Sequence, residues 1–194
     1  MQKTIDRVFS KEDDSYIYVI SEIGVNHNGS LSEAIKLIEA SAEAGVDAVK
    51  FQKRNLEKIY SKKILDDPNS AEWSLDYLIP LLREVELSKE DYYIIKDKCE
   101  ELGLDLIVTP FDEDSAEFVA SLDIAAFKIA SADMINFSLI DKCASYNKPL
   151  IISTGMWEEE DIRKCAKYYE KKGIKYAFLL ANSTYPSPYE SLNL

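Results

Sequence analysis

The sequence has little of what metal and redox sites are usually built from: one histidine and three cysteines in 194 residues. Cys99, Cys143 and Cys165 lie far apart and form no C-x-x-C pair, so we expect neither a disulfide framework nor a structural zinc site. His27 also has no second ligand at short spacing, which makes it a poor candidate for a metal site. This cysteine usage is typical of a reducing, cytoplasmic setting.

Basic residues and long apolar runs are scarce as well. Lys and Arg number 23 against 35 Asp and Glu, a formal net charge of -12, which argues against binding to nucleic acid and against docking on anionic membranes. No apolar run approaches the roughly 20 residues that a membrane-spanning helix needs, and the N-terminal stretch before Tyr16 lacks the apolar core of a signal peptide. We therefore expect a soluble, cytoplasmic protein that acts on small molecules.

One pattern recurs along the chain. The segments "EAGVDAVKF", "ELGLDLIVT" and "KKGIKYAFLL" each pass from a charged helical stretch, through a glycine, into a short apolar run. Gly45, Gly103 and Gly173 stand where helices end in a left-handed residue, and Asn147 takes that place in "SYNKPLIIS". The nearly continuous apolar runs are typical of parallel strands covered on both faces. The pattern predicts strands near 16–23, 46–52, 104–109, 124–129, 149–153 and 175–181, and helices near 31–44, 88–102, 113–121, 136–146 and 158–172.

Strict alternation of strands and helices leaves two architectures, an open doubly wound sheet or a (β/α)8 barrel. The sequence contains neither a G-x-G-x-x-G fingerprint nor a P-loop, which weakens the nucleotide-binding form of the first. The predicted strands are too few for a complete barrel, and the mixed stretch 53–87 is expected to be an excursion with a short helix of its own. The pattern therefore indicates an α/β chain and leaves open whether it is an open doubly wound sheet or an incomplete TIM barrel of about six βα units.

Every predicted strand delivers polar side chains at its carboxyl end, where ligands gather in both architectures. Lys50 and Lys128 are notable because each lies between two apolar neighbours, where an unpaired ammonium is costly or loses its proton. Each lysine either reaches the rim or pairs with a carboxylate on a neighbouring strand, or the two converge on an anionic ligand such as a phosphate or carboxylate. A Schiff-base role for Lys128 is a further alternative.

The carboxylates best placed for acid–base chemistry or for holding sugar hydroxyls are Glu22 and Asp133. Asp133 is almost as well explained as the N-cap of the following helix. In "SEIGVNHNGS" we expect a tight turn, with Gly29 allowing the bend and Ser30 capping the next helix. His27 then orients this turn behind the pocket.

Six segments together resemble the sialic acid synthase family, in its order and spacing: "EIGVNHNGS", "AVKFQKR", "TPFDEDS", "FKIASADMINFSLI", "PLIISTGM" and "STYPSPYE". The resemblance covers nearly the whole chain from Tyr16 onward and leaves 1–15 as an N-terminal extension. It implies a (β/α)8 barrel, residues 16–194 being part of it. It also implies condensation of phosphoenolpyruvate with an N-acylated hexosamine such as N-acetylmannosamine or its 6-phosphate, giving a nonulosonic acid and phosphate.

The resemblance also assigns roles to individual positions. Lys50 and Lys128 correspond to lysines that bind phosphoenolpyruvate, with Thr109 meeting its carboxylate. The phosphate is assigned to Ser131 and Ser183. The remaining positions implied near the acceptor or lining the pocket are Glu22, Gln52, Phe111, Asp133, Ser153, Asn182 and Tyr185, with Asn26 and His27 behind them.

The resemblance further implies parts that these residues do not contain. In the family, a divalent metal, Mn2+ or Mg2+, polarises the sugar aldehyde and is held by histidines on later barrel strands, and an antifreeze-like domain follows the barrel. We therefore expect that the chain alone holds no metal, has no condensation activity, and aggregates or pairs through its open edges, while the full-length enzyme is a homodimer. The rival hypotheses are a Schiff-base aldolase using Lys128 and a non-catalytic anion-binding or interaction fragment.

Overall fold

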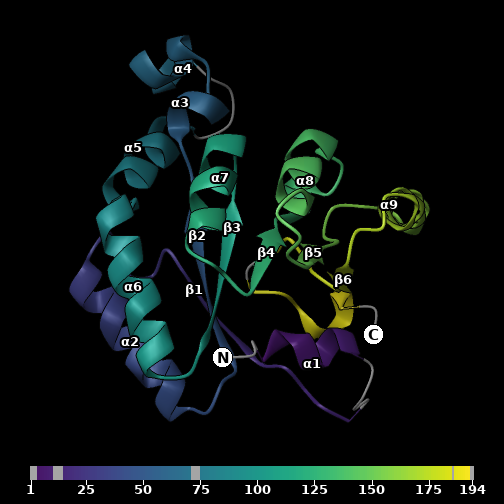
Figure 1. Ribbon diagram of the computed structural model, residues 1–194. Helices are drawn as coiled ribbons and strands as arrows, with labels where there is room; N and C mark the ends of the chain where they lie inside the picture. Colours follow the sequence, from purple (N-terminus) through teal and green to yellow (C-terminus); the bar gives the residue numbers. More distant parts are fainter. Residues whose placement is uncertain (1–3, 11–14, 71–74, 185, 193–194) are drawn as a thin grey trace.

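The computed structural model describes residues 4–10, 15–70, 75–184 and 186–192 (Figure 1). Their core is a six-stranded sheet in which every neighbouring pair of strands is parallel and the spatial order follows the chain. The strands are β1 (Ile20–Gly24), β2 (Ala48–Lys53), β3 (Asp105–Pro110), β4 (Ala126–Ile129), β5 (Leu150–Ser153) and β6 (Tyr176–Leu179). This sequential parallel order is that of a TIM barrel, so the α/β incomplete-barrel prediction is confirmed.

Helices follow the strands and cover the outer face of the curved sheet (Figure 1). They are α2 (Leu31–Glu43), α6 (Lys89–Glu101), α7 (Glu113–Ser121), α8 (Phe137–Ala144) and α9 (Glu159–Lys171). Each lies within two residues of its predicted bounds. No helix within the described ranges has the length and apolar content needed to cross a membrane.

The predicted start and stop signals explain these bounds. Ser30 caps α2 by accepting the backbone N–H of Glu33, as the sequence predicts. Gly45, Gly103 and Gly173 all have positive φ at the ends of α2, α6 and α9, and Asn147 adopts φ 57° after α8. These residues turn the chain back into the next strand, which keeps successive strands parallel.

Alternation along the strands separates an inner from an outer face. Register pairs Lys50 with Ile107 and Lys128 with Ile151, so these four side chains share the concave face. The outer set, which includes Phe51 and other large apolar residues of the strands, packs against the helices in the larger hydrophobic cluster. Small and apolar residues therefore fill the lower interior, and the lysines lie in the layer above, toward the carboxyl ends.

The described part of the N-terminal extension contains a helix. Residues Ile5–Ser10 form α1, which lies at the amino ends of the strands (Figure 1). Ile5 is 1% exposed and packs with Ala48, Ile107 and their inner-face neighbours, and Phe9 packs against the same cluster. Helix α1 therefore covers the lower end of the sheet's interior.

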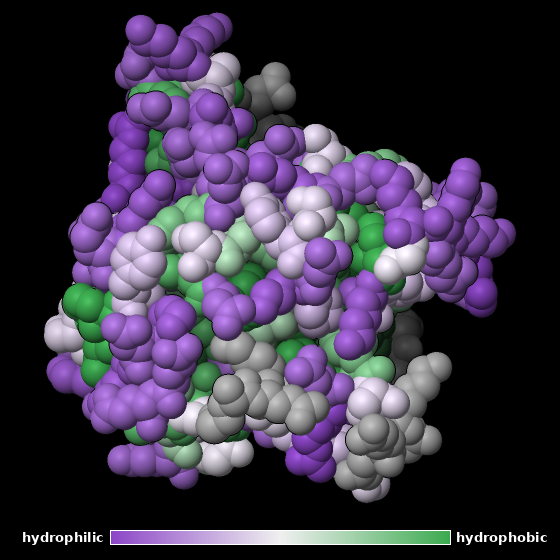
Figure 2. All heavy atoms as spheres, in the orientation of Figure 1, coloured by the Kyte–Doolittle hydropathy of each residue, from purple (hydrophilic) through white to green (hydrophobic). Residues whose placement is uncertain are grey.

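The expectation of one short helix in 53–87 is wrong. The described part of this stretch forms α3 (Leu56–Ile59), α4 (Lys62–Asp66), the 3-10 turn η1 (Pro68–Ser70) and α5 (Leu75–Val85). The longest of them, α5, contains Pro80 in its interior, where proline normally interrupts a helix. Helices α3 and α4 project above β2, and Figure 2 shows mostly hydrophilic side chains over them.

Candidate active site at the carboxyl ends of the strands

An ion pair joins the ends of β1 and β2. The Lys50 ammonium lies 2.8 Å from the Glu22 carboxylate; the lysine side chain is buried, whereas that of Glu22 is 57% exposed. The register shifts between Glu22 and Gly24, which has φ 59°, so a bulge sets the direction of Glu22. Of the alternatives for Lys50, pairing with a carboxylate on a neighbouring strand is therefore the one found in this structure. Glu22 stays more than half exposed at the carboxyl ends of the strands, which we call the mouth of the half-barrel.

For Lys128 on β4, no carboxylate among the described residues lies within ion-pair distance. Its ammonium donates to the Ser153 hydroxyl at 2.6 Å and to the Ile129 carbonyl at 2.9 Å. Burial, and then the nearby Lys50 charge, lower the pKa of Lys128 to about 8, against a weaker opposing effect of Glu22. Two lysines thus share the mouth with Glu22, and only Lys50 has an ion-pair partner among the described residues, which leaves the Lys128 charge available to an anion.

A second group of donors lies at the ends of β4, β5 and β6. A methyl group built on Gly155 would meet the Ser183 hydroxyl at 2.9 Å and the Ser131 hydroxyl at 3.0 Å. Both hydroxyls therefore converge on the space that the missing side chain leaves; we call Ser131, Gly155 and Ser183 the serine cradle. The Trp157 indole donates to the Ser131 carbonyl at 2.6 Å and fixes that part of the cradle. Such hydroxyls beside two cations suit an oxyanion such as phosphate.

Strands β2 and β3 supply a third side of the mouth. Thr109 is buried on β3, in register with Gln52 of β2. The Gln52 side chain accepts a hydrogen bond from Arg54, whose guanidinium lies 4.5 Å from the centre of the Phe111 ring. Gln52 and Thr109 therefore lie side by side at the ends of their strands, and Arg54 connects Phe111 to Gln52; the roles of these residues toward a ligand stay predictions.

Asp133 lies in the short turn η2 (Ser131–Asp133), directly after the cradle serine. Its N-cap alternative is wrong, because Asn136 caps α8 by accepting the N–H of Leu139. Asn136 also donates to the Asp133 carboxylate at 3.2 Å. Burial raises the pKa of Asp133, and the bond from Asn136 opposes that effect. Asp133 is thus a partly buried carboxylate next to the proposed phosphate donors.

His27 is buried behind the mouth, not within it. Its ring stacks on Phe51, and its Nδ1 accepts the Gly29 N–H at 3.1 Å. Burial lowers the pKa of His27, against a hydrogen bond to the Gly24 backbone. The neutral ring therefore joins the bulge of β1 to the following turn. Asn26 supports the same turn by donating to the Ile23 carbonyl at 3.0 Å.

Two remaining candidates lie after β6. Asn182 donates to the Ser191 hydroxyl at 2.7 Å and accepts the Thr184 N–H at 2.9 Å, so it shapes the loop beside Ser183. Tyr185 lies outside the described residues. Their roles toward a ligand stay predictions.

Three residues of this region were not among the predicted site residues. Arg54 directly follows the "AVKFQK" stretch, and Gly155 and Trp157 lie in and beside "STGM". The sequence motifs include or adjoin these positions. However, only the coordinates show that Gly155 leaves space for a ligand, and which groups the Trp157 indole and the Arg54 guanidinium contact.

A metal site is not supported by the residues present. Within the described ranges, no three His, Cys, Asp or Glu side chains converge so that they could hold a metal ion. Glu22 is paired with Lys50, and the His27 Nδ1 is engaged by a backbone N–H. We therefore derive no reaction step through a metal.

Comparison with known proteins gives a consistent result. A profile of the NeuB family matches residues 37–194. The N,N'-diacetyllegionaminic acid synthase of Legionella pneumophila is 37% identical over 186 residues, which cover 91% of this chain and 52% of that protein. The human N-acetylneuraminate-9-phosphate synthase is 32% identical over 179 residues, covering 91% of this chain and 50% of that protein. The chain thus spans about half the length of the curated relatives it matches.

Solved structures resemble the fold as well. The sialic acid synthetase of Leptospira borgpetersenii, crystallised with citrate, superposes with a TM-score of 0.79 at 25% identity, over 91% of this chain and 58% of that one. The spore coat polysaccharide biosynthesis protein SpsE of Bacillus subtilis superposes with a TM-score of 0.76 at 33% identity, over 92% of this chain and 48% of that one.

Proposed function

This chain belongs to the NeuB family, and on that premise we propose that it is the phosphoenolpyruvate-binding part of a nonulosonic acid synthase. The observation that carries the proposal is a pair of buried lysines near the serine cradle, of which only Lys50 has a carboxylate partner among the described residues. A ligand with both a carboxylate and a phosphate matches two cations and separated sets of hydroxyl donors.

The proposed reaction joins two small molecules. C3 of phosphoenolpyruvate forms a bond to the aldehyde carbon of an open-chain N-acylated hexosamine; water adds at C2; the C2–O bond to phosphate then breaks, leaving a 2-keto acid and phosphate. Lys50 and Lys128 bind the anionic substrate, and Ser131 and Ser183 hold the phosphate that leaves. Glu22 is the carboxylate most open to the mouth, and we assign it the proton exchange with the acceptor.

The proposal is tested by calorimetric titration of the chain with phosphoenolpyruvate, pyruvate and inorganic phosphate. We expect the intact substrate to bind more tightly than either part, because it occupies the lysines and the serine cradle at once. Phosphate binding as tight as that of phosphoenolpyruvate would reduce the chain to a general anion binder, and absence of binding would overturn the proposal.

Gly155→Ala should weaken phosphoenolpyruvate binding about tenfold, ~1.4 kcal/mol, because the added methyl group enters the serine cradle. Gly155 has no positive φ, so any loss of thermal stability comes from the contacts of the methyl group, which include the Ala181 carbonyl oxygen at 3.2 Å, and not from backbone strain. Gly103→Ala is the contrasting control: its methyl group meets nothing within 4 Å, but φ is 71°, so it should lower stability and leave affinity unchanged. Unchanged affinity in Gly155→Ala would remove the cradle from the site.

The aldolase alternative rests on the lowered pKa of Lys128. We expect no covalent trapping when the chain is treated with pyruvate and sodium borohydride, because the ammonium is already engaged by Ser153 and the Ile129 carbonyl. Intact mass measurement checks this. A reduced pyruvyl adduct that disappears in Lys128→Met would favour the aldolase over the synthase.

A further inference from the structure

A cavity of about 830 Å³ lies beside the mouth, outside the barrel interior. Its walls come from the last residue of β2 and the one after it (Lys53, Arg54), from helices α3 to α5, from the start of α6 (Lys89) and from the first two turns of α7, including Phe118. Its volume falls within the range of sites for small organic ligands. None of the roles assigned above uses this space.

Arg54 is the unusual residue of this wall. It is 7% exposed, yet among the described residues no carboxylate lies within ion-pair distance of its guanidinium. Its side chain donates one hydrogen bond, to Gln52, and stacks on Phe111. Every fully buried polar side-chain atom in the described part has a partner, so the other guanidinium N–H groups retain some accessible surface.

Such an arrangement is costly without an anion. A guanidinium keeps its proton in proteins, so it cannot neutralise itself as a buried lysine can. Burial lowers the pKa of Arg54, in the direction expected for a cation removed from water, although Glu86 opposes the effect. The stacked ring and Gln52 hold the planar group in place, which prepares it for bidentate hydrogen bonding.

The other charges of the wall support the same conclusion. Glu86 is occupied by Lys53 at 2.6 Å, and Asp114 lies 3.2 Å from Lys58. Among the described residues, the lining cations that have no carboxylate partner are Arg54, Lys62, Arg83 and Lys89, and the lining carboxylates that have no cation partner are Glu57 and Asp66. The remaining balance is positive in a chain whose net charge is -12.

We propose that this cavity is a second anion-binding site, separate from the Lys50–Lys128 site, which holds the phosphate group of a small phosphate monoester through Arg54. The phosphate has two possible sources. It belongs either to the far end of the acceptor, which would extend past Gln52 from the mouth, or to a separate phosphorylated metabolite.

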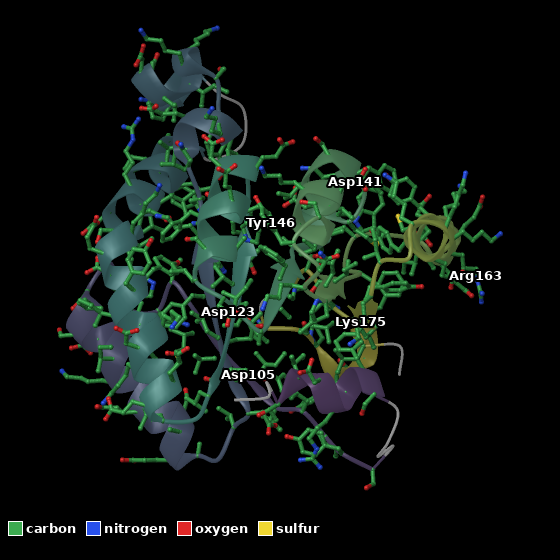
Figure 3. All side chains as sticks on the ribbon, in the orientation of Figure 1. Asp105, Asp123, Asp141, Tyr146, Arg163 and Lys175 are labelled. Carbon is green, nitrogen blue, oxygen red and sulfur yellow. The ribbon has the colours of Figure 1, made fainter. Side chains whose placement is uncertain are left out.

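The test uses calorimetric titration of the whole chain with inorganic phosphate while phosphoenolpyruvate saturates the first site. We expect binding that weakens at least tenfold in Arg54→Gln and stays unchanged in Arg163→Gln, an exposed arginine on α9 that points away from the core (Figure 3). Phosphoenolpyruvate affinity should be the same in the parent chain and in Arg163→Gln, and in Arg54→Gln it should fall less than the phosphate affinity does. Equal phosphate binding in the two variants, or none in the parent chain, would overturn the proposal.

Two further measurements distinguish the two sources of the phosphate, and distinguish a failure of this proposal from a failure of the proposed phosphoenolpyruvate site. Tighter, Arg54-dependent binding of N-acetylmannosamine 6-phosphate than of glycerol 1-phosphate would assign the phosphate to the acceptor, and equal binding would assign it to a separate metabolite. The Lys50→Ala/Lys128→Ala chain should still bind phosphate through Arg54, so the site is testable even if phosphoenolpyruvate does not bind. If Arg54→Gln does not fold, Arg54→Lys replaces it, because lysine keeps the positive charge but cannot make the two parallel hydrogen bonds of a guanidinium. We expect Arg54→Lys to lose less phosphate affinity than Arg54→Gln would. An unchanged phosphate affinity in Arg54→Lys would count against the proposal.

Discussion

Replacing Lys50 and Lys128 together by alanine should weaken phosphoenolpyruvate binding by about 100-fold or more, ~2.7 kcal/mol. Both ammonium groups belong to the inner layer of the half-barrel, and both are buried, so water cannot replace their interaction with the substrate. Calorimetric titration of the double variant and the two single variants measures the effect. Arg163→Ala, which removes an exposed cation, is the control and should leave the affinity unchanged.

The single variants should differ from one another. Lys50→Ala also frees Glu22, which then places an unpaired carboxylate at the mouth and repels the substrate. Lys128→Ala removes a cation that faces no carboxylate directly, so its effect is closer to the loss of one attraction. A loss in the double variant no larger than in Lys50→Ala alone would show that Lys128 does not face the substrate.

The affinity should also depend on pH through Lys128. Its pKa of about 8 means that the side chain is cationic at pH 7 and loses its charge as the pH rises further. Binding of an anion should therefore weaken above about pH 8, and this pH dependence should disappear in Lys128→Met. An affinity that is flat from pH 7 to 9 in the parent chain would contradict the assignment.

Stability should move in the opposite direction. The pKa of Lys128 is lower in the folded chain than its ordinary value of 10.5, so the unfolded chain binds more protons between about pH 8 and 10.5. The free energy of unfolding should thus rise with pH across that window, and the penalty is present in full below it. Lys128 therefore illustrates a site residue that serves binding at a cost in stability.

The sequence was informative where local chemistry decides the structure. Glycine or asparagine at the helix ends and Ser30 as an N-cap follow from backbone and capping geometry, and all were found as predicted. The continuous apolar strands imply a parallel sheet, whose carboxyl ends bring distant residues together. For that reason Lys50 and Lys128, 78 positions apart in the chain, could be assigned to one site before any coordinates.

The parts that could not be predicted depend on long-range contacts. In 53–87, α3 and α4 are only four and five residues long, too short for a helical period to show, and Pro80 argues against a helix at α5 although its apolar residues have helical spacing. Arg54 is a candidate binding residue because its guanidinium is buried in a cavity wall, which only the structure shows. The sequence "KFQKR" alone shows a lysine and an arginine after a strand. Similarly, nothing local in "TIDRVFS" shows that α1 packs beneath the sheet.

Helix α1 leads to the second large effect, which concerns stability. Asp105, at the start of β3, is 4% exposed and accepts the Ile5 N–H at 2.7 Å and the Tyr18 hydroxyl at 2.8 Å. Figure 3 labels it beside α1, at the end of the sheet opposite the mouth. One buried carboxylate therefore connects the first helix, the segment before β1 and the middle of the sheet.

Asp105→Ala should lower the free energy of unfolding by about 2 to 4 kcal/mol, because it leaves one buried and one partly buried donor without an acceptor and removes atoms from a packed interior. Urea denaturation measures the loss, and Asp97→Ala, which replaces an exposed aspartate on α6, should stay within about 0.5 kcal/mol of the parent.

Tyr18→Phe removes one of the two donors to Asp105 and should cost about 1 kcal/mol. If Asp105→Ala were no more harmful than Tyr18→Phe, the anchoring of α1 through the Ile5 N–H would contribute nothing, and the apolar contacts of Ile5 and Phe9 would alone hold the helix beneath the sheet. Phosphoenolpyruvate affinity in folded Asp105→Ala should be unchanged, since the lysines lie in a different layer of the interior.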